Sequence, residues 1–288
     1  MRVDGRQIAD AMYRNLKKRV GVLEKSHGII PHLAVILAGD NPSSLAYIRQ
    51  KEKGAQQTDA KVTLIRFSTN TNTAEIVTKI KQLNNDKSIH GIIIQKPLPQ
   101  QIDVGTIDRS VTPEKDLDGF NAKSPYTLAL PLAVVEILKY IYELQNKSFS
   151  ETKFINWLRS KNVAISGKGP TGGGPTIKYF NRLGIPTKVI DRKTSNPSAL
   201  FKSADIIIAS TGYKDILLTK DVKQGAILIG VGVYKGEDGK LHGDYEEKDI
   251  AGIAGYYTPT PGGVGPVNVA CLITNLITAA EKQINLLS

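Results

Sequence analysis

The segment Val163-Ala-Ile-Ser-Gly-Lys-Gly-Pro-Thr-Gly-Gly-Gly-Pro175 decides the fold class of this 288-residue chain. Its first four residues have the composition of a short buried strand, and the glycines that follow satisfy the G-x-G-x-x-G spacing ahead of a helix. In a strand–loop–helix setting, such glycines let the backbone approach a pyrophosphate group at the helix N-terminus. The segment therefore predicts dinucleotide binding by Gly167, Lys168, Gly169, Gly172 and Gly173.

The chain continues from this segment with further strands that alternate with helices. We predict strands at 186–190, 205–212 and 226–233, and the last two contain glycine near their carboxyl ends. Short buried strands separated by helices are typical of a Rossmann-like domain. Such sheets bind ligands at the carboxyl ends of their strands. We therefore expect the cofactor site to include Asp191, Arg192, Thr211, Gly232 and Val233.

The first part of the chain shows the same alternation of strands and helices. Its apolar runs of strand length suit a parallel sheet that is buried on both faces. The predicted strands are 31–38, 61–67 and 90–95. The predicted helices are 6–25, 43–57, 73–84 and 104–109, followed by 131–144. With the length of the chain, the pattern predicts an α/β protein of two domains, with a polar link at 145–153.

Polar side chains stand near the ends of the predicted strands in this first part. Lys51 lies on the helix after the first strand, and Tyr47 precedes it by four residues, so both side chains emerge on one helix face. Gln95 ends the third strand, and Asp118 lies in a loop farther along. Because parallel strands end at a common edge, we expect a catalytic cleft there. From Tyr47 and Lys51 alone, a solvated lysine on a basic helix remains the simpler interpretation.

A second loop, Thr258-Pro-Thr-Pro-Gly-Gly-Val-Gly-Pro266, lies near the C-terminus. Three prolines and three glycines in nine residues argue against helix or central strand anywhere within it. It leads into an apolar helix expected at 267–280. A rigid loop that exposes amides before a helix N-terminus favours ligand binding, and an ordinary turn is the alternative.

The composition limits the class of protein. Hydrophobic residues make up 41% and charged residues 23%, which is typical of a soluble globular protein. The sequence has no uninterrupted apolar run of about 18 residues and no signal-like N-terminus, so we expect a cytoplasmic protein without a membrane partner. The single cysteine, Cys271, excludes an intramolecular disulfide. The four histidines show no ligand spacing, and we expect no metal.

The net charge of +11 raises the question of nucleic-acid binding. The positive charge is spread evenly along the chain, without a basic tail or an arginine run. Such a field suits small anionic ligands. We expect no nucleic-acid partner, although a non-catalytic nucleotide- or nucleic-acid-binding module remains an alternative.

Five separated motifs, taken in order, resemble the bifunctional methylenetetrahydrofolate dehydrogenase/methenyltetrahydrofolate cyclohydrolase family. The resemblance extends over nearly the whole chain. The motifs are Val3-Asp-Gly5, Gly39-x-Asn-Pro-Ser-Ser-x-x-Tyr47-Ile-x-x-Lys51, Gly91-Ile-Ile-Ile-Gln95-x-Pro-Leu-Pro99, Pro113-x-Lys-Asp-Leu-Asp118-Gly-Phe and Pro261-Gly-Gly-Val-Gly-Pro266.

The resemblance implies roles for individual residues. Tyr47 would stack on the pterin, and Lys51 would transfer protons in the cyclohydrolase step. Gln95 would hold and tune that lysine, and Asp118 would hydrogen-bond the pterin ring. These four form the expected catalytic group. The substrate-binding residues implied are Tyr47, Asp118, Pro261, Gly262 and Gly263.

The resemblance also implies an activity and an arrangement of domains. The enzyme would oxidise 5,10-methylene-tetrahydrofolate to the 5,10-methenyl compound with NADP and hydrolyse that product to 10-formyl-tetrahydrofolate. Residues 1–125, completed by 263–288, would form the folate-binding catalytic domain. Residues 126–262 would form the Rossmann-like dinucleotide-binding domain. A homodimer is expected.

The cofactor half departs from the family pattern at several positions. Lys168-Gly169 stands where arginine and serine are usual, and Gly230-Val-Gly replaces Asp-Val-Gly. A cyclohydrolase with weak or lost dehydrogenase activity is therefore an alternative. Asp191 favours NAD because a carboxylate repels a 2′-phosphate, whereas nearby cations favour NADP. We expect NADP, with NAD as the alternative.

Overall fold

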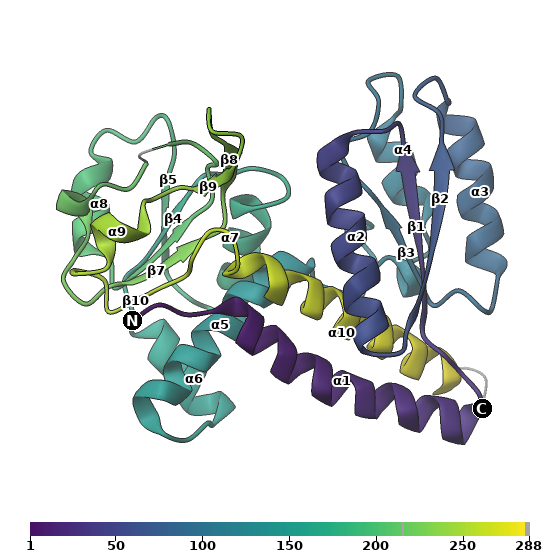
Figure 1. Ribbon diagram of the computed structural model, residues 1–288, viewed down its shortest axis with the longest axis horizontal. Helices are drawn as coiled ribbons and strands as arrows, with labels where there is room; N and C mark the ends of the chain where they lie inside the picture. The colour runs from purple at the N-terminus through teal and green to yellow at the C-terminus, as the bar shows by residue number, and fades with distance from the viewer. Residues whose placement is uncertain (215, 286–288) are drawn as a thin grey trace. The chain divides into compact units, whose positions relative to one another are not determined.

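The computed structural model describes residues 1–214 and 216–285 (Figure 1). The chain forms two compact units. The first unit contains residues 10–129 and the chain from Val269 onward, and the second contains residues 1–9 and 130–268. The sequence-based boundaries differ from these units in placing residues 1–9 and 263–268 with the catalytic domain and residues 126–129 with the dinucleotide-binding domain. The division between the units falls inside the first and last helices.

A parallel sheet of three strands, in the order β2-β1-β3, forms the centre of the first unit. Its strands are β1 (His32–Ala38), β2 (Lys61–Phe67) and β3 (Gly91–Ile94). The three predicted strands are confirmed, with ends that differ by at most one residue. All of β3 and all but the first residue of β1 are buried, which explains their unbroken apolar sequences.

Helices cover the sheet of the first unit. They are α1 (Gly5–His27), α2 (Pro42–Gln57), α3 (Thr73–Asn85), α4 (Val104–Ser110) and α10 (Val264–Asn285), with a 3₁₀ turn at Pro113–Lys115. The helices α3 and α4 pack on one face of the sheet through a shared apolar core, and Figure 1 shows α2 on the other face. That core includes Ala34, Ile36, Ile76, Ile80, Ile92 and Ile107.

The second unit contains a parallel sheet in the order β10-β7-β6-β4-β5. Its strands are β4 (Val163–Ser166), β5 (Thr187–Ile190), β6 (Ile206–Ala209), β7 (Ile227–Gly230) and β10 (Tyr256–Tyr257). Its helices are α5 (Ala129–Asn146), α6 (Glu151–Arg159), α7 (Gly173–Arg182), α8 (Pro197–Ser203) and α9 (Glu247–Ile250), with a 3₁₀ turn at Thr219–Asp221. The order β6-β4-β5 places the glycine loop after β4, an interior strand with a neighbour on each side.

Four details of the sequence-based assignment are wrong. The strand predicted at 205–212 is shorter, because β6 ends at Ala209. The predicted link at 145–153 is shorter, because α5 continues to Asn146 and α6 begins at Glu151. The buried residues Phe154 and Leu158, four positions apart, give α6 its apolar face.

The predicted strand at 226–233 is in fact two strands. β7 ends at Gly230, and Val233 begins an antiparallel hairpin of β8 (Val233–Lys235) and β9 (Leu241–Gly243). The helix α10 begins at Val264, so Gly265 and Pro266 are helical. Proline is tolerated in a first helical turn, where its missing N–H would have had no partner within the helix.

Among the described residues, one helix is long and apolar enough to cross a membrane by length and composition. It is Val264–Ile284, with a mean hydropathy of 1.3, and 67% of its most apolar window is buried inside the protein. The core helix of a soluble protein has the same properties. The sequence analysis did not foresee this helix as a candidate span, because polar residues interrupt its apolar run.

Candidate active site

The helix α2 presents two of the predicted site residues. Its N-terminus is capped by Asn41, whose side-chain oxygen accepts hydrogen bonds from the amides of Ser43 and Ser44, at 2.9 and 3.2 Å. Tyr47 is 47% exposed, whereas Lys51, one turn later, is half-buried. The aromatic face of Tyr47 is thus available to a ligand beside a partly desolvated amine.

Gln95 follows β3 directly and contacts Lys51. Its backbone amide donates to the carbonyl of Ile36, at 2.9 Å, which extends the pairing of β3 with β1. The ammonium group of Lys51 donates to Oε1 of Gln95 at 3.0 Å. Nε2 of Gln95 donates to the carbonyl of Lys96 at 2.8 Å, and this second bond fixes which end of the amide faces the lysine. The structure therefore brings Lys51 and Gln95 together.

Asp118 interacts with Lys51 through the charges of the two side chains. Burial lowers the pKa of Lys51, and the nearby Asp118 carboxylate partly offsets this effect. Burial raises the pKa of Asp118, and the positive charges of Lys51 and Lys96 oppose that rise. A lysine whose pKa lies closer to neutrality can exchange protons at physiological pH. Tyr47, Lys51, Gln95 and Asp118 all belong to the first unit.

Two buried residues that sequence reasoning missed hold the loop of Asp118. The ammonium group of Lys115 donates to the carbonyls of Leu83, Asn84 and Asp86, at 2.9, 2.9 and 2.7 Å, at the end of α3. Asn275 of α10 donates from Nδ2 to the carbonyls of Leu117 and Thr127, at 3.1 and 2.9 Å. Lys115 lies within the third motif, which could have drawn attention to it. No local pattern marks Asn275.

The glycine loop of the second unit has the close approaches that a phosphate cradle requires. Gly167 has φ of +89°, a left-handed conformation that favours glycine. A side chain at Gly173 would collide with the carbonyl of Gly167, so the first turn of α7 packs directly on the end of β4. The space beside Gly169 is open. The predicted loop thus fits a pyrophosphate group at the start of α7.

Charged side chains lie beside this loop. The ammonium group of Lys168 is 2.6 Å from Oδ2 of Asp191, and its hydrogen bond lowers the pKa of that carboxyl. Arg192 donates from Nη2 to the hydroxyl of Tyr213 at 2.7 Å, and its guanidinium carbon is 5.3 Å from the centre of that ring. Asp191 is thus paired with Lys168, whereas Arg192 is held by Tyr213.

Thr211 and Gly232 are connected to a residue that the sequence analysis missed. The buried carboxylate of Asp244 accepts from the hydroxyl and amide of Thr211, at 2.5 and 3.2 Å. It also accepts from the amides of Gly212 and Gly232, at 2.7 and 3.0 Å. Val233, the last predicted cofactor residue, is 40% exposed. Asp244 thus joins the ends of β6 and β7, and no spacing in the sequence indicates this.

The proline- and glycine-rich loop before α10 is held by the beginning of the chain. The amide of Gly5 donates to the carbonyl of Gly262 at 2.9 Å. The hydroxyl of Thr258 accepts from the amide of Gly230 at 2.8 Å. Gly262 and Gly263 are buried and Pro261 is exposed. These contacts explain why the first and last motifs occur together within the second unit.

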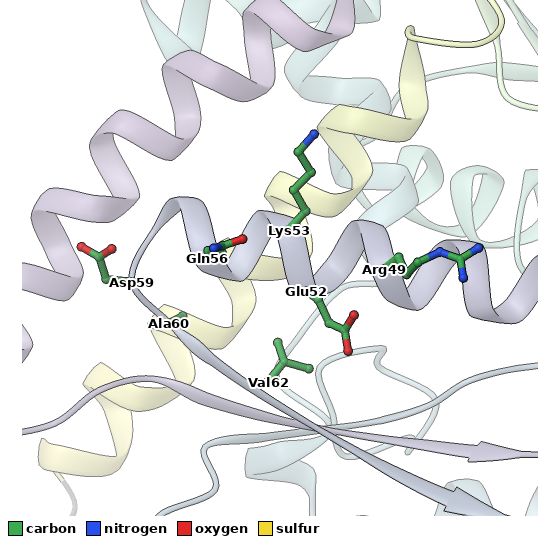
Figure 2. A pocket seen from close by; sticks show the side chains of 7 residues that line it. All are labelled: Arg49, Glu52, Lys53, Gln56, Asp59, Ala60 and Val62. Carbon is green, nitrogen blue, oxygen red and sulfur yellow. The ribbon is translucent and has the colours of Figure 1, made fainter.

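An open hollow lies beside α2 and the start of β2 (Figure 2). It is lined by Arg49, Glu52, Lys53, Gln56, Asp59, Ala60 and Val62. Figure 2 shows Lys53 and Glu52 projecting from opposite sides of the α2 ribbon. Because these charged groups point in opposite directions, they do not converge on a common ligand in the hollow.

Comparison with known proteins agrees with this geometry. A family model described as the catalytic domain of tetrahydrofolate dehydrogenase/cyclohydrolase matches residues 3–118. The model of the NAD(P)-binding domain of the same enzymes matches residues 150–284. The chain belongs to the tetrahydrofolate dehydrogenase/cyclohydrolase family. The resemblance stated from the motifs is confirmed, and so is the two-domain α/β fold class.

Individual members of the tetrahydrofolate dehydrogenase/cyclohydrolase family match over almost their whole length. The bifunctional protein FolD of Streptococcus agalactiae is 35% identical over 286 residues, which cover 99% of each chain. The structure of FolD from Campylobacter jejuni has a TM-score of 0.89 at 32% identity and covers 98% of this chain and 99% of that one. The enzyme of Trypanosoma brucei, solved with NADP and an inhibitor, has a TM-score of 0.88 at 26% identity, with coverage of 99% and 98%.

Proposed function

We propose that this protein oxidises 5,10-methylene-tetrahydrofolate to 5,10-methenyl-tetrahydrofolate with NADP and hydrolyses that product to 10-formyl-tetrahydrofolate. Membership of the family supports both activities. One observation carries the cyclohydrolase half of the proposal. The half-buried amine of Lys51 is bonded to a neutral amide, Gln95, at 3.0 Å, with the Asp118 carboxyl nearby.

In the hydrolysis, Lys51 moves protons to and from the folate. Its neutral form accepts a proton from the water that adds to the methenyl carbon, and the ammonium group then donates a proton to ring nitrogen N5 as the bond from that carbon to N5 breaks. The hydroxyl proton of the adduct passes to solvent as the formyl carbonyl forms. Gln95 orients Lys51 without adding a charge that would hold it protonated.

Tyr47 and Asp118 hold the folate in this proposal. The exposed ring of Tyr47 offers a face on which the flat pterin stacks. Asp118 in its ionised form accepts hydrogen bonds from the N–H groups of the pterin. Pro261, Gly262 and Gly263 remain predicted substrate-binding residues.

The second unit would hold NADP, which supplies a hydride acceptor when bound. Gly167, Gly169 and Gly173 fit its pyrophosphate group at the start of α7. Because Lys168 pairs with Asp191, the repulsion between this carboxylate and a 2′-phosphate is reduced. Arg192, the next residue along the chain, is held by the hydroxyl of Tyr213 and is the cation that we assign to the phosphate.

A homodimer in the cytoplasm, without nucleic-acid or membrane partners, is also part of the proposal. It rests on the family resemblance and on the even spread of positive charge. Light scattering during size-exclusion chromatography measures the mass of the assembly. A single 31.3 kDa species would contradict the dimer.

A spectrophotometric assay tests the function. The purified protein is mixed with 5,10-methylene-tetrahydrofolate and either NADP or NAD, while reduced cofactor and the methenyl compound are followed. We expect reduced cofactor to form faster with NADP and added methenyl-tetrahydrofolate to decay. Decay without any cofactor reduction would instead identify a cyclohydrolase that lacks dehydrogenase activity, and the absence of both would overturn the proposal.

A further inference from the structure

Lys96 follows Gln95 and has no part in the mechanism above. Its ammonium group is 2.8 Å from Oδ2 of Asp108 on α4. The two side chains are only 21% and 16% exposed, so the pair is largely removed from solvent. An ion pair in such a position is screened less by water and salt than one on the surface.

Lys96 also contacts the loop that carries Asp118. Its ammonium group lies 3.4 Å from the centre of the Phe120 ring, two residues after Asp118. This distance is well within the range of a cation–π interaction. The backbone carbonyl of Lys96 accepts the hydrogen bond that orients Gln95. One residue therefore touches both the loop of Gln95 and the loop of Asp118.

We propose that Lys96 is a positioning residue that joins these two loops and places a second positive charge beside the Asp118 carboxylate. The inference rests on the proposed function, because it concerns folate binding by Asp118. It adds a residue outside the four that the motifs identified.

Three charged groups act on Asp118. Lys51 of α2 and Lys96 after β3 favour its ionised form, and Asp108 of α4 opposes it. Asp116, in the same loop, is influenced in turn by the charge of Asp118, and burial raises the pKa of Asp116 to about 6. Lys96 and Asp108 therefore form one ion pair but have opposite effects on Asp118.

These opposite effects distinguish the two halves of the pair. Replacing Lys96 by methionine keeps the length of the side chain but removes a positive charge, so Asp118 should lose its proton at a higher pH. Asp108→Asn breaks the same ion pair but removes a negative charge, so Asp118 should lose its proton at a lower pH. A merely structural role of the pair would give both variants the same change.

The experiment measures the carboxyl titration of Asp118 by carbon-13 NMR in the whole protein, with the signal assigned through Asp118→Asn. We expect Lys96→Met to shift the midpoint upward, Asp108→Asn to shift it downward and Lys96→Arg to retain it. Shifts in the same direction, or no shift in either variant, would overturn the proposal. If circular dichroism shows that Lys96→Met does not fold, the Asp108→Asn variant alone tests the proposal. A downward shift of its midpoint supports the proposal, and no shift overturns it.

Kinetics test the positioning part. Phe120→Leu removes the aromatic contact and leaves every charge in place, so we expect KM for the folate to rise by about fivefold. Its kcat and the titration of Asp118 should stay near those of the native protein. An unchanged KM would contradict a positioning role for the contact between Lys96 and Phe120. A native protein without folate-dependent activity would contradict the proposed function, while the carboxyl titration would still test the charge effect.

Discussion

Lys51 and Gln95 come from different elements of the first unit and meet through a hydrogen bond of 3.0 Å. The lysine projects from α2, and the amide stands at the end of β3, which is hydrogen-bonded to β1. The bond therefore links two strand–helix units whose strands, β1 and β3, are neighbours in the sheet. A neutral acceptor leaves the charge of the lysine free to change during proton transfer.

Lys51→Met should abolish hydrolysis selectively. Methionine keeps the aliphatic length but cannot exchange protons, so we expect the cyclohydrolase rate to fall by about 100-fold or more. Hydride transfer should continue, because it depends on the position of the substrate. Decay of the methenyl absorbance measures the loss. Lys53→Met, on the exposed face of the same helix, is the matched control, and equal losses in both variants would exclude the proposed role.

Gln95→Glu should shift the pH dependence of hydrolysis. A carboxylate at this position would raise the pKa of Lys51, so the neutral amine would appear only at higher pH. We expect the rising limb of the pH–rate profile to move to higher pH and kcat at neutral pH to fall. Gln95→Asn shortens the amide without adding charge, and it should lower the rate without the same displacement. A profile that is unmoved in Gln95→Glu would count against tuning by this residue.

Arg192→Ala should weaken NADP more than NAD. Loss of a charge-assisted contact with the 2′-phosphate should raise KM for NADP by about tenfold or more, whereas NAD has no group there to lose. Initial rates with each cofactor give the comparison. Lys202→Ala removes a positive charge from an exposed position on α8 and serves as the control. Equal effects on both cofactors would assign Arg192 to another role.

His90 should make the protein less stable as the pH falls from about 6.5 to about 4. Burial lowers its pKa to about 4, and its Nδ1 accepts a hydrogen bond of 3.1 Å from the amide of His32. Between these pH values the unfolded chain binds a proton at this position and the folded protein does not, so the free energy of unfolding decreases, by up to about 3 kcal/mol.

Urea denaturation at several pH values measures this effect. His90→Asn keeps an acceptor near the amide of His32 but does not titrate, so it should flatten the dependence. His27→Asn, at an exposed position, should leave it unchanged. An equally steep fall in His90→Asn would place the effect in another group.

The sequence predicted the parts of the fold that depend on local pattern. Unbroken apolar runs located the parallel strands, and their common carboxyl edge explains why Lys51 and Gln95 were expected to meet. It did not predict Asn275, Asp244 or the contact of Lys96 with Phe120. These residues act across long sequence separations, and their partners are mostly backbone groups, which leave no spacing in the chain. The start of α10 was misplaced because a proline and a glycine lie in its first turn.

Asp244 fills a position where backbone amides from the ends of two strands converge. The protein thus supplies its own anion at this point, and these donors are already occupied before any nucleotide arrives. Attempts to re-engineer the coenzyme preference should therefore leave Asp244 unchanged. They should instead substitute Lys168, Asp191 and Arg192, whose side chains contact no buried residue.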